Sequence, residues 1–410
     1  SNSIRYLSVK LYNQGRNLTI YPCESIRRTV WTRNAGSMSR PVALELPMYI
    51  VDAFSSRPFT GNPAAVCLCV PGVKLADDVR QRIAAEMNHS ETAFVEPLGE
   101  TSKGMEVFSS DSAFGLRWFT PTCEVPCCGH ATLASAAVLL LACDNLHPAI
   151  SFHTLSGELV VSRASTAAAT IHNTAKSPTT ANTRLAENDA LDQQPLSSPQ
   201  QLALSLLLPL CEPVDPVPAC AEDPAGLLVR ACAGSLPVRE VLYCAKRGLN
   251  YVLLVLEDSV SRRELEALRP DFAAMMRAAS AEEVHGVIVC AKTGLGSMTG
   301  TCAGQISEGN GAEPEAEVCS RFFAPWMGIN EDPVTGSAHA VLGSYWDSVL
   351  QRAGVWGLAG ASVGQGGGIA MRMRQCSARG GEVTVEVLRE EGRVRVTGMA
   401  TLVLEGKMRF

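Results

Sequence analysis

Several features that would place this protein in a specialised class are missing from its sequence. The longest apolar stretch, at about residues 138–143, is far shorter than the roughly 20 residues that a membrane-spanning helix needs. The net charge of −6 is spread without long runs of one sign, which excludes the basic surface that nucleic acids and anionic membranes require. We therefore predict a soluble protein whose partner is a small molecule, with no nucleic acid or membrane partner.

Motifs for metals, disulfides and nucleotides are missing as well. The 15 cysteines are scattered and form no CxxC pair, which argues against a zinc ribbon or a secreted disulfide framework. Most of them are expected to be small buried side chains in a reducing compartment, the cytoplasm. No glycine-rich phosphate loop, neither GxGxxG nor GxxxxGK with Ser or Thr, links a predicted strand to a helix. We predict no cofactor and no metal.

One pattern is present twice. Residues 115–142 read GLRWFTP, a short bridge, then CGHAT at the start of a helix that carries no charge from 131 to 143. Residues 321–350 read RFFAP, a longer bridge, then TGSAH at the start of another apolar helix, whose only charge is Asp347. A helix that is apolar on all sides must be buried, so the unpaired N–H groups of its first turn lie in the interior. Two such helix starts predict a paired anion site.

The order of predicted elements repeats in the same way. Each half shows two strands, a helix, two strands and a buried helix, and the second half interrupts its first helix at Pro270. The first helix carries an apolar stripe of Leu75, Val79, Ile83 and Met87. We infer a tandem duplication in which each sheet curls around its own central helix, leaving a cleft between the domains.

Composition indicates the domain boundaries. At 410 residues and 46% hydrophobic content, the chain can form two domains. We predict the first domain at 47–185, with a strand at 396–410 that returns to it, and the second domain at 186–395. Residues 1–46 form a basic N-terminal extension, either an organellar transit segment or a poorly ordered tail. Residues 165–201 are expected to be a linker or surface insertion, and 304–316 and the glycine-rich 354–368 to be further insertions.

Three side chains near these features have the chemistry for proton transfer. Glu91 stands where the amphipathic helix meets an apolar strand, which by position alone favours a solvated loop acid. His130 lies in the first turn of a buried helix, where the dipole disfavours the cation, so it is either a neutral hydrogen-bonding group or a packed interior histidine. Asp332 precedes a proline, which by itself indicates only a turn.

Six segments together resemble the PhzF family of phenazine-biosynthesis-like isomerases. They are residues 51–68, 90–97, 116–136, 320–339, 375–382 and 393–406, and they follow one another in the family's order from about residue 47 to the end of the chain. The resemblance implies the α+β diaminopimelate-epimerase fold, with two pseudo-symmetric domains, each a sheet wrapped around a central helix. It also implies a homodimer.

The same resemblance implies roles for individual residues. Glu91 matches the family's general acid/base, and burial that raised its pKa would suit it to exchange a proton with carbon. Asp332 and Ser337 match residues that face the substrate, and His130 is expected to relay protons or orient the substrate. The amides at Gly129, His130, Gly336 and Ser337 would then bind a substrate carboxylate. We also expect Asn62 at the substrate site, although for it and Arg379 we favour structural roles.

Cys128 and Thr335 distinguish two mechanisms. In the related diaminopimelate epimerases and proline racemases, a cysteine precedes each paired glycine, and two thiols move the proton. Here Cys128 holds the first position and Thr335 the second. A threonine hydroxyl is not an acid/base at neutral pH, so one-base isomerisation through Glu91 fits better than two-thiol racemisation.

The sequence thus predicts a cofactor-independent isomerase of a small carboxylate-bearing metabolite, in which Glu91 moves a proton between carbons. Two alternatives stay open. One is an amino-acid racemase or epimerase that uses Cys128. The other is a scaffold or interaction protein that has kept the fold and lost the chemistry, with the insertions as docking surface.

Overall fold

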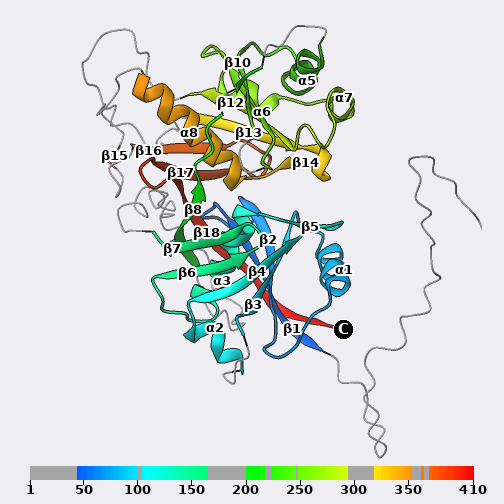
Figure 1. The fold of residues 1–410 in the computed structure, drawn as a ribbon, viewed down its shortest axis with the longest axis vertical. Coiled ribbons are helices and arrows are strands. Elements are labelled where there is room, and N and C mark those ends of the chain that lie inside the picture. Colours follow the sequence, from blue (N-terminus) through cyan, green and yellow to red (C-terminus); the bar gives the residue numbers. More distant parts are fainter. Residues whose placement is uncertain are drawn as a thin grey trace, which may run out of the picture. The chain divides into compact units, whose positions relative to one another are not determined.

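The computed structural model describes residues 44–99, 104–164, 200–213, 215–217, 223–245, 248–293, 318–352, 362–363 and 369–410. Within them, residues 45–410 belong to a single compact unit. Two buried helices, α3 and α8, organise this unit, and each is covered by strands (Figure 1).

The first half of the chain builds a mixed sheet around α3 (Gly129–Leu141). Most neighbouring strands are antiparallel. Two pairs are parallel: β2 and β3, which are connected through helix α1, and β4 and β6, which are connected through helix α3. The strands are β1 (Glu45–Ala53), β2 (Asn62–Leu68), β3 (Thr92–Pro97), β4 (Ala113–Phe119), β5 (Glu124–Val125), β6 (Ala149–Thr154), β7 (Gly157–Arg163) and β8 (Gln201–Pro209); the further helices are α1 (Asp77–Met87), η2 (Gly104–Glu106) and α2 (Val107–Ser110).

The second half repeats this plan around α8 (Gly336–Arg352), with two parallel pairs, β11 with β12 and β13 with β16. Here the crossover between β11 and β12 contains two short helices, α6 and α7, because Pro270 separates them. The strands are β9 (Asp215–Pro216), β10 (Val238–Cys244), β11 (Tyr251–Leu256), β12 (Gly286–Lys292), β13 (Val318–Ala324), β14 (Ile329–Asp332), β15 (Ser362–Val363), β16 (Ile369–Gln375), β17 (Gly381–Leu388) and β18 (Arg393–Arg409); the helices are α5 (Pro224–Ala233), α6 (Arg262–Ala267), α7 (Phe272–Ala278) and η4 (Pro325–Met327).

Apolar composition explains why α3 and α8 are interior helices. Twelve of the thirteen residues of α3 are buried, so it contacts protein on every side rather than along one stripe. Both helices contribute to one large hydrophobic core. A second core lies on the other face of the second sheet, where α5, α6 and α7 cover it. The start of each buried helix is therefore enclosed by protein.

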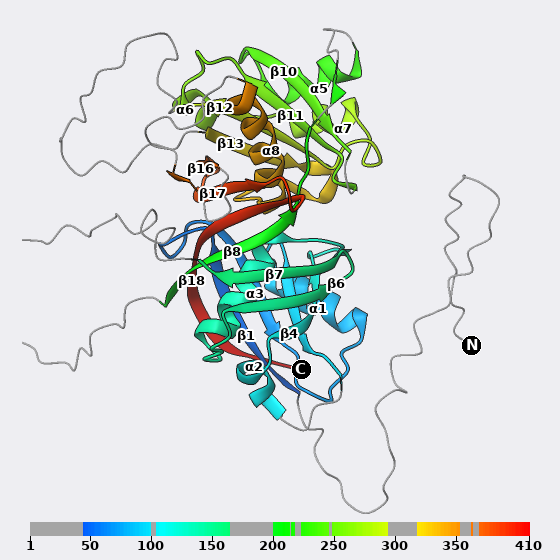
Figure 2. The same ribbon diagram turned by 60° about the vertical axis from the view of Figure 1, so that its left-hand side comes forward.

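Strand β18 joins the two halves. Its first residues pair with β17, its later residues pair with β1, and β8 runs antiparallel beside it (Figure 2). The predicted returning strand at 396–410 therefore corresponds to most of β18, which begins at Arg393. None of the helices in the described ranges is long and apolar enough to cross a membrane.

The duplicated element order and the helix interruption at Pro270 are confirmed. One detail of the amphipathic helix is wrong: α1 begins at Asp77, after Leu75, and its buried residues include Arg80, which pairs with Asp77 and Glu96. Strands β6, β7, β8, β16 and β17 were not predicted. The predicted linker overlaps the structure only at residues 200–201, where Gln201 begins β8, and the segment 304–316 lies outside the described residues, as does most of 354–368.

Candidate active site

Glu91 is placed in the interior by the strand that follows it. Helix α1 ends at Met87, and the left-handed backbone of the next residue, Asn88 (φ 51°), turns the chain toward β3. Strand β3 pairs with β2 on one side and β4 on the other, so its beginning lies inside the sheet. Glu91, directly before β3, is only 8% exposed. The alternative of a solvated loop acid is therefore wrong.

The imidazole of His130 lies between Glu91 and Cys128. Its Nε2 is 3.3 Å from Oε2 of Glu91 and 3.3 Å from Oγ of Ser90, and its Nδ1 is 3.4 Å from Sγ of Cys128. Oε2 of Glu91 is buried, and its 3.3 Å contact with Nε2 of His130 is longer than an ordinary N–H···O hydrogen bond. This oxygen is therefore only weakly satisfied within the protein and can accept a stronger hydrogen bond from a ligand.

These three side chains are also the group that could hold a metal ion. One candidate ligand atom from each of Glu91, Cys128 and His130 lies within 4.8 Å of the others. However, the close sulfur contact is to Nδ1 and the close carboxylate contact is to Nε2, on different sides of the ring. A metal takes one nitrogen from each histidine. The geometry therefore suits proton transfer through the imidazole better than metal binding.

Asp332, at the end of β14, is held by residues from distant parts of the chain. Nδ2 of Asn62 donates to its Oδ1 at 2.8 Å, and the Thr335 hydroxyl donates to its Oδ2. Gln375 also holds this segment: its Nε2 donates to the backbone oxygen of Asp332 at 2.6 Å, and its Oε1 accepts from the backbone N–H of Thr335 at 2.8 Å. Asn62 therefore has a structural role here, since its amide joins the first half to Asp332.

Burial sets the charges of the two carboxyl groups. Desolvation, reinforced by the negative charge of Asp332, raises the pKa of Glu91 to about 8. Desolvation also raises the pKa of Asp332, to about 6, although the hydrogen bonds from Thr335 and Asn62 oppose the shift. Between these values Asp332 is ionised, while Glu91 keeps its proton.

The neighbouring groups are neutral. Burial, with a smaller contribution from His89, lowers the pKa of His130 to about 3, so the imidazole is uncharged, as predicted. Burial is the largest cause of this shift, and the position of His130 in the first turn of α3 acts in the same direction. Burial raises the pKa of the Cys128 thiol well above its usual value, so the sulfur keeps its proton at neutral pH.

The two buried helices meet at their first residues. A Cβ added to Gly129 would lie 3.4 Å from Cα of Gly336, and one added to Gly336 would lie 3.5 Å from Cα of Gly129. The first amides of a helix have no acceptor in their own helix. Ser337, which follows Gly336, is half-buried and therefore accessible to a ligand. The structure thus brings both helix starts together, as the paired anion site requires.

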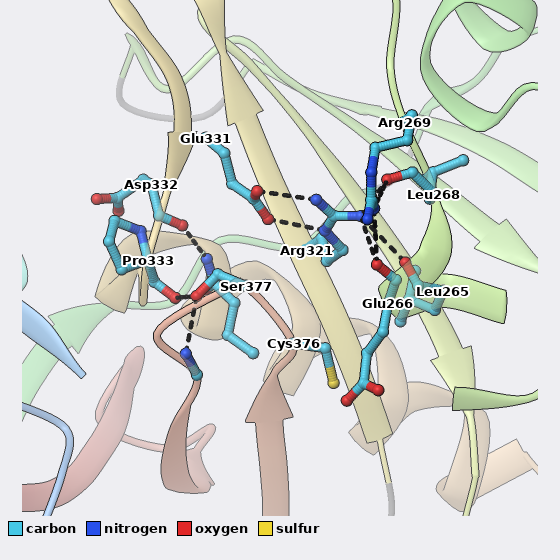
Figure 3. Close-up of polar contacts among 12 residues, drawn as sticks. Leu265, Glu266, Leu268, Arg269, Arg321, Glu331, Asp332, Pro333, Cys376 and Ser377 are labelled. Atoms are coloured by element: carbon cyan, nitrogen blue, oxygen red, sulfur yellow. Dashed lines mark hydrogen bonds and ion pairs between the residues drawn. The ribbon is translucent and has the colours of Figure 1, made fainter. Parts of the chain in front are cut away.

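Further contacts hold the strand that carries Asp332 (Figure 3). Glu331 accepts two hydrogen bonds from Arg321, at 2.7 and 2.8 Å, and Arg321 also donates to the carbonyl of Leu268 at 2.6 Å. On the other side, the Ser377 hydroxyl donates to the carbonyl of Pro333 at 2.8 Å. Asp332 therefore lies between two anchored residues.

Arg379 and Tyr251 complete the surroundings of the site. Arg379 donates to Oδ1 of Asp52 at 2.7 Å and to the carbonyl of Gly61 at 2.8 Å, which agrees with the expected structural role. The hydroxyl of Tyr251 lies 3.0 Å from that of Ser337. Tyr251, like Gln375 and Arg321, was not predicted, because no local pattern in the sequence shows which distant side chains reach the two helix starts.

Comparison with known proteins gives a consistent result. The family model described as "Phenazine biosynthesis-like protein", PhzC-PhzF, matches residues 51–406. A human protein named "Phenazine biosynthesis-like domain-containing protein" is 36% identical over 89% of this chain and 99% of its own length. An uncharacterized isomerase of Pseudomonas aeruginosa is 35% identical over 90% of this chain and its full length.

Solved structures agree on the fold. The crystal structure of a PhzF-family phenazine biosynthesis protein from Enterococcus faecalis has a TM-score of 0.60 and 28% identity, covering 89% of this chain and 99% of the other. A predicted epimerase of Pseudomonas aeruginosa, 18% identical over 88% of this chain and 99% of the other, has a TM-score of 0.53. The α+β epimerase-like fold is confirmed, with two pseudo-symmetric halves around α3 and α8.

Proposed function

Because this chain belongs to the phenazine biosynthesis-like (PhzC-PhzF) family, we propose that it is a cofactor-independent isomerase of a small carboxylate-bearing metabolite. Its family and its relative named as an isomerase support an isomerase-type function. The finer proposal concerns the mechanism: Glu91 moves one proton between two carbons of the substrate. The substrate carboxylate binds the amides at Gly129, His130, Gly336 and Ser337.

One observation carries this proposal: the carboxyl of Glu91 is buried next to His130, 3.3 Å from its Nε2, and burial raises its pKa to about 8. In the reaction, a C–H bond breaks and its proton passes to Glu91 while the double bond shifts; the new O–H bond then breaks and returns the proton to another carbon. A pKa near the working pH suits both steps, because neither protonation state is strongly favoured. Asp332 and His130 orient the substrate or relay the proton.

The thiol alternative has less support. Cys128 has no cysteine opposite it, since Thr335 stands at the second position and its hydroxyl is bound to Asp332. Burial keeps the Cys128 thiol protonated, and a protonated thiol is a poor base. Within the isomerase proposal, Cys128 is a packing group beside His130. We also propose a homodimer, which light scattering of the full chain would test.

The experiment that tests the function is NMR of small unsaturated and amino carboxylic acids incubated with the protein in deuterated water. Deuterium uptake at one carbon that depends on Glu91 would support the isomerase and identify its substrate class. Uptake that is unchanged in Glu91→Gln but is blocked by a thiol reagent would support the Cys128 racemase instead. Binding without any exchange would favour the scaffold alternative.

The carboxyl pair predicts an unusual titration. In carbon-13 NMR of the carboxyl groups, assigned with Glu91→Gln and Asp332→Asn, we expect Glu91 to titrate near pH 8 and Asp332 near pH 6. In Asp332→Asn the pKa of Glu91 falls, because the neighbouring negative charge is removed. Because Glu91 must be ionised to take the proton from carbon, the proton exchange rate is expected to rise with pH toward about 8 and to level off above it. An ordinary glutamate titration at Glu91 would contradict the effect of burial on its pKa.

A further inference from the structure

Tyr251 approaches the proposed carboxylate site from the second sheet. It is the first residue of β11, and its ring packs against the core that contains α8. Its partner across the parallel pair with β12 is Gly286. A side chain at Gly286 is excluded, because an added Cβ would lie 2.3 Å from Cζ of Phe322. The ring of Phe322 therefore occupies the place beside Tyr251.

Phe322 sets the direction of the Tyr251 ring. The two rings meet edge to face, with centroids 5.0 Å apart and planes at 64°. Phe322 is also the register partner of Asp332 across β13 and β14. Tyr251 is thus packed against the strand pair that carries Asp332, while its hydroxyl reaches Ser337 at 3.0 Å. Such a ring has little freedom to turn its hydroxyl elsewhere.

The direction of the hydrogen bond follows from acidity. A phenol is more acidic than an alcohol, so in a pair of hydroxyls the phenol is the better donor. Burial and the nearby Cys127 and Asp332 raise the pKa of Tyr251 further, so it keeps its proton throughout the physiological range. When Tyr251 donates to Oγ of Ser337, the serine hydrogen is free to donate to another acceptor. Donation to the serine oxygen also strengthens the serine as a donor.

We propose that Tyr251 is a positioning residue that holds the Ser337 hydroxyl ready to donate to the substrate carboxylate at the start of α8. This inference rests on the proposed carboxylate site and adds to it a specific donor. The amides of the two helix starts would bind an anion through their partial charge, whereas an oriented hydroxyl adds one directed hydrogen bond, which is stronger to a charged carboxylate oxygen than to the neutral carbonyl of the corresponding amide. Tyr251 itself acts only through Ser337.

The test measures binding of acetate, benzoate and crotonate, and of the three corresponding amides, by ligand-observed NMR with the full chain. Wild-type protein should bind at least one acid in preference to its amide. Tyr251→Phe should weaken that binding about fivefold to tenfold, the effect of losing one neutral hydrogen bond between the two hydroxyls. Ser337→Ala should weaken it by at least as much. The double variant should be no weaker than Ser337→Ala, because Tyr251 acts through the serine.

The matched control is Tyr243→Phe, which removes a phenol that donates to the carbonyl of Glu283 at 2.8 Å from the neighbouring strand β10. This control should bind the acids like wild type. The inference is overturned if Tyr251→Phe binds like wild type, if the two single effects add in the double variant, or if wild type does not distinguish any acid from its amide. Glu91→Gln, which should still bind the acids, tests the isomerase chemistry separately through deuterium exchange.

Discussion

Glu91→Gln is expected to lower isomerase turnover by about a hundredfold to ten-thousandfold, the usual contribution of a positioned acid/base. The amide has nearly the same shape as the carboxyl group but does not take a proton from carbon. Ligand binding should persist, because the carboxylate contacts come from the helix starts and not from Glu91. The measurement is the rate of deuterium incorporation into the substrate, with Glu86→Gln, an exposed residue of α1, as the control.

The same variant should not lose stability. Because burial raises the pKa of Glu91 to about 8 in the folded protein, the unfolded chain releases this proton at lower pH than the folded chain. The wild-type free energy of unfolding therefore falls as pH rises from about 4.5, the ordinary value, toward 8. Glutamine carries no such penalty, so the free energy of unfolding of Glu91→Gln, measured by urea titration, should equal that of wild type in acid and exceed it at pH 8.

Full turnover in Glu91→Gln would disprove the assignment of Glu91 as the acid/base.

Arg321→Met is expected to lower the free energy of unfolding by about 3 kcal/mol, the low end of the cost of breaking a buried ion pair, because the side chain of Glu331 is 22% exposed. Arg321 is 6% exposed and is the common donor to Glu331 on β14 and to the carbonyls of Leu265 in α6 and of Leu268 directly after it. Its loss leaves the carboxylate and both carbonyls without this donor. Urea unfolding at neutral pH measures the effect.

Two further variants separate this effect from a general loss of charge. Arg262→Met removes an arginine of α6 whose i,i+4 pair with Glu266 is exposed, so it should cost only about 0.5 kcal/mol. Adding Glu331→Leu to Arg321→Met should recover part of the stability, because the unpaired carboxylate is removed. An equal cost for Arg321→Met and Arg262→Met would show that the buried pair does not hold β14.

Much of the fold could be predicted because it depends on local patterns. The absence of charge from 131 to 143 required α3 to be buried, Pro270 separated α6 from α7, and the repeated helix starts indicated the duplication. Strands β6, β7 and β8 were missed. Strand β8 begins directly after a polar, Pro-rich segment, and its identity depends on pairing with β7 and with β18, about two hundred residues away in the chain. No window of sequence contains that partner.

For the site, the sequence by itself determined which groups were available: an acid before a core strand at Glu91, a histidine in a buried first turn at His130, and an acid before a proline at Asp332. It also determined that two helix starts would be enclosed, because composition alone decides whether a helix can face water. Only the tertiary structure decided that Asn62 and Gln375 hold Asp332, that Tyr251 reaches Ser337, and that burial raises the pKa of Glu91 to about 8. The physical reason is that hydrogen bonds and desolvation depend on distances in space, and folding brings these residues together from positions as far as 313 apart in the sequence, as between Asn62 and Gln375.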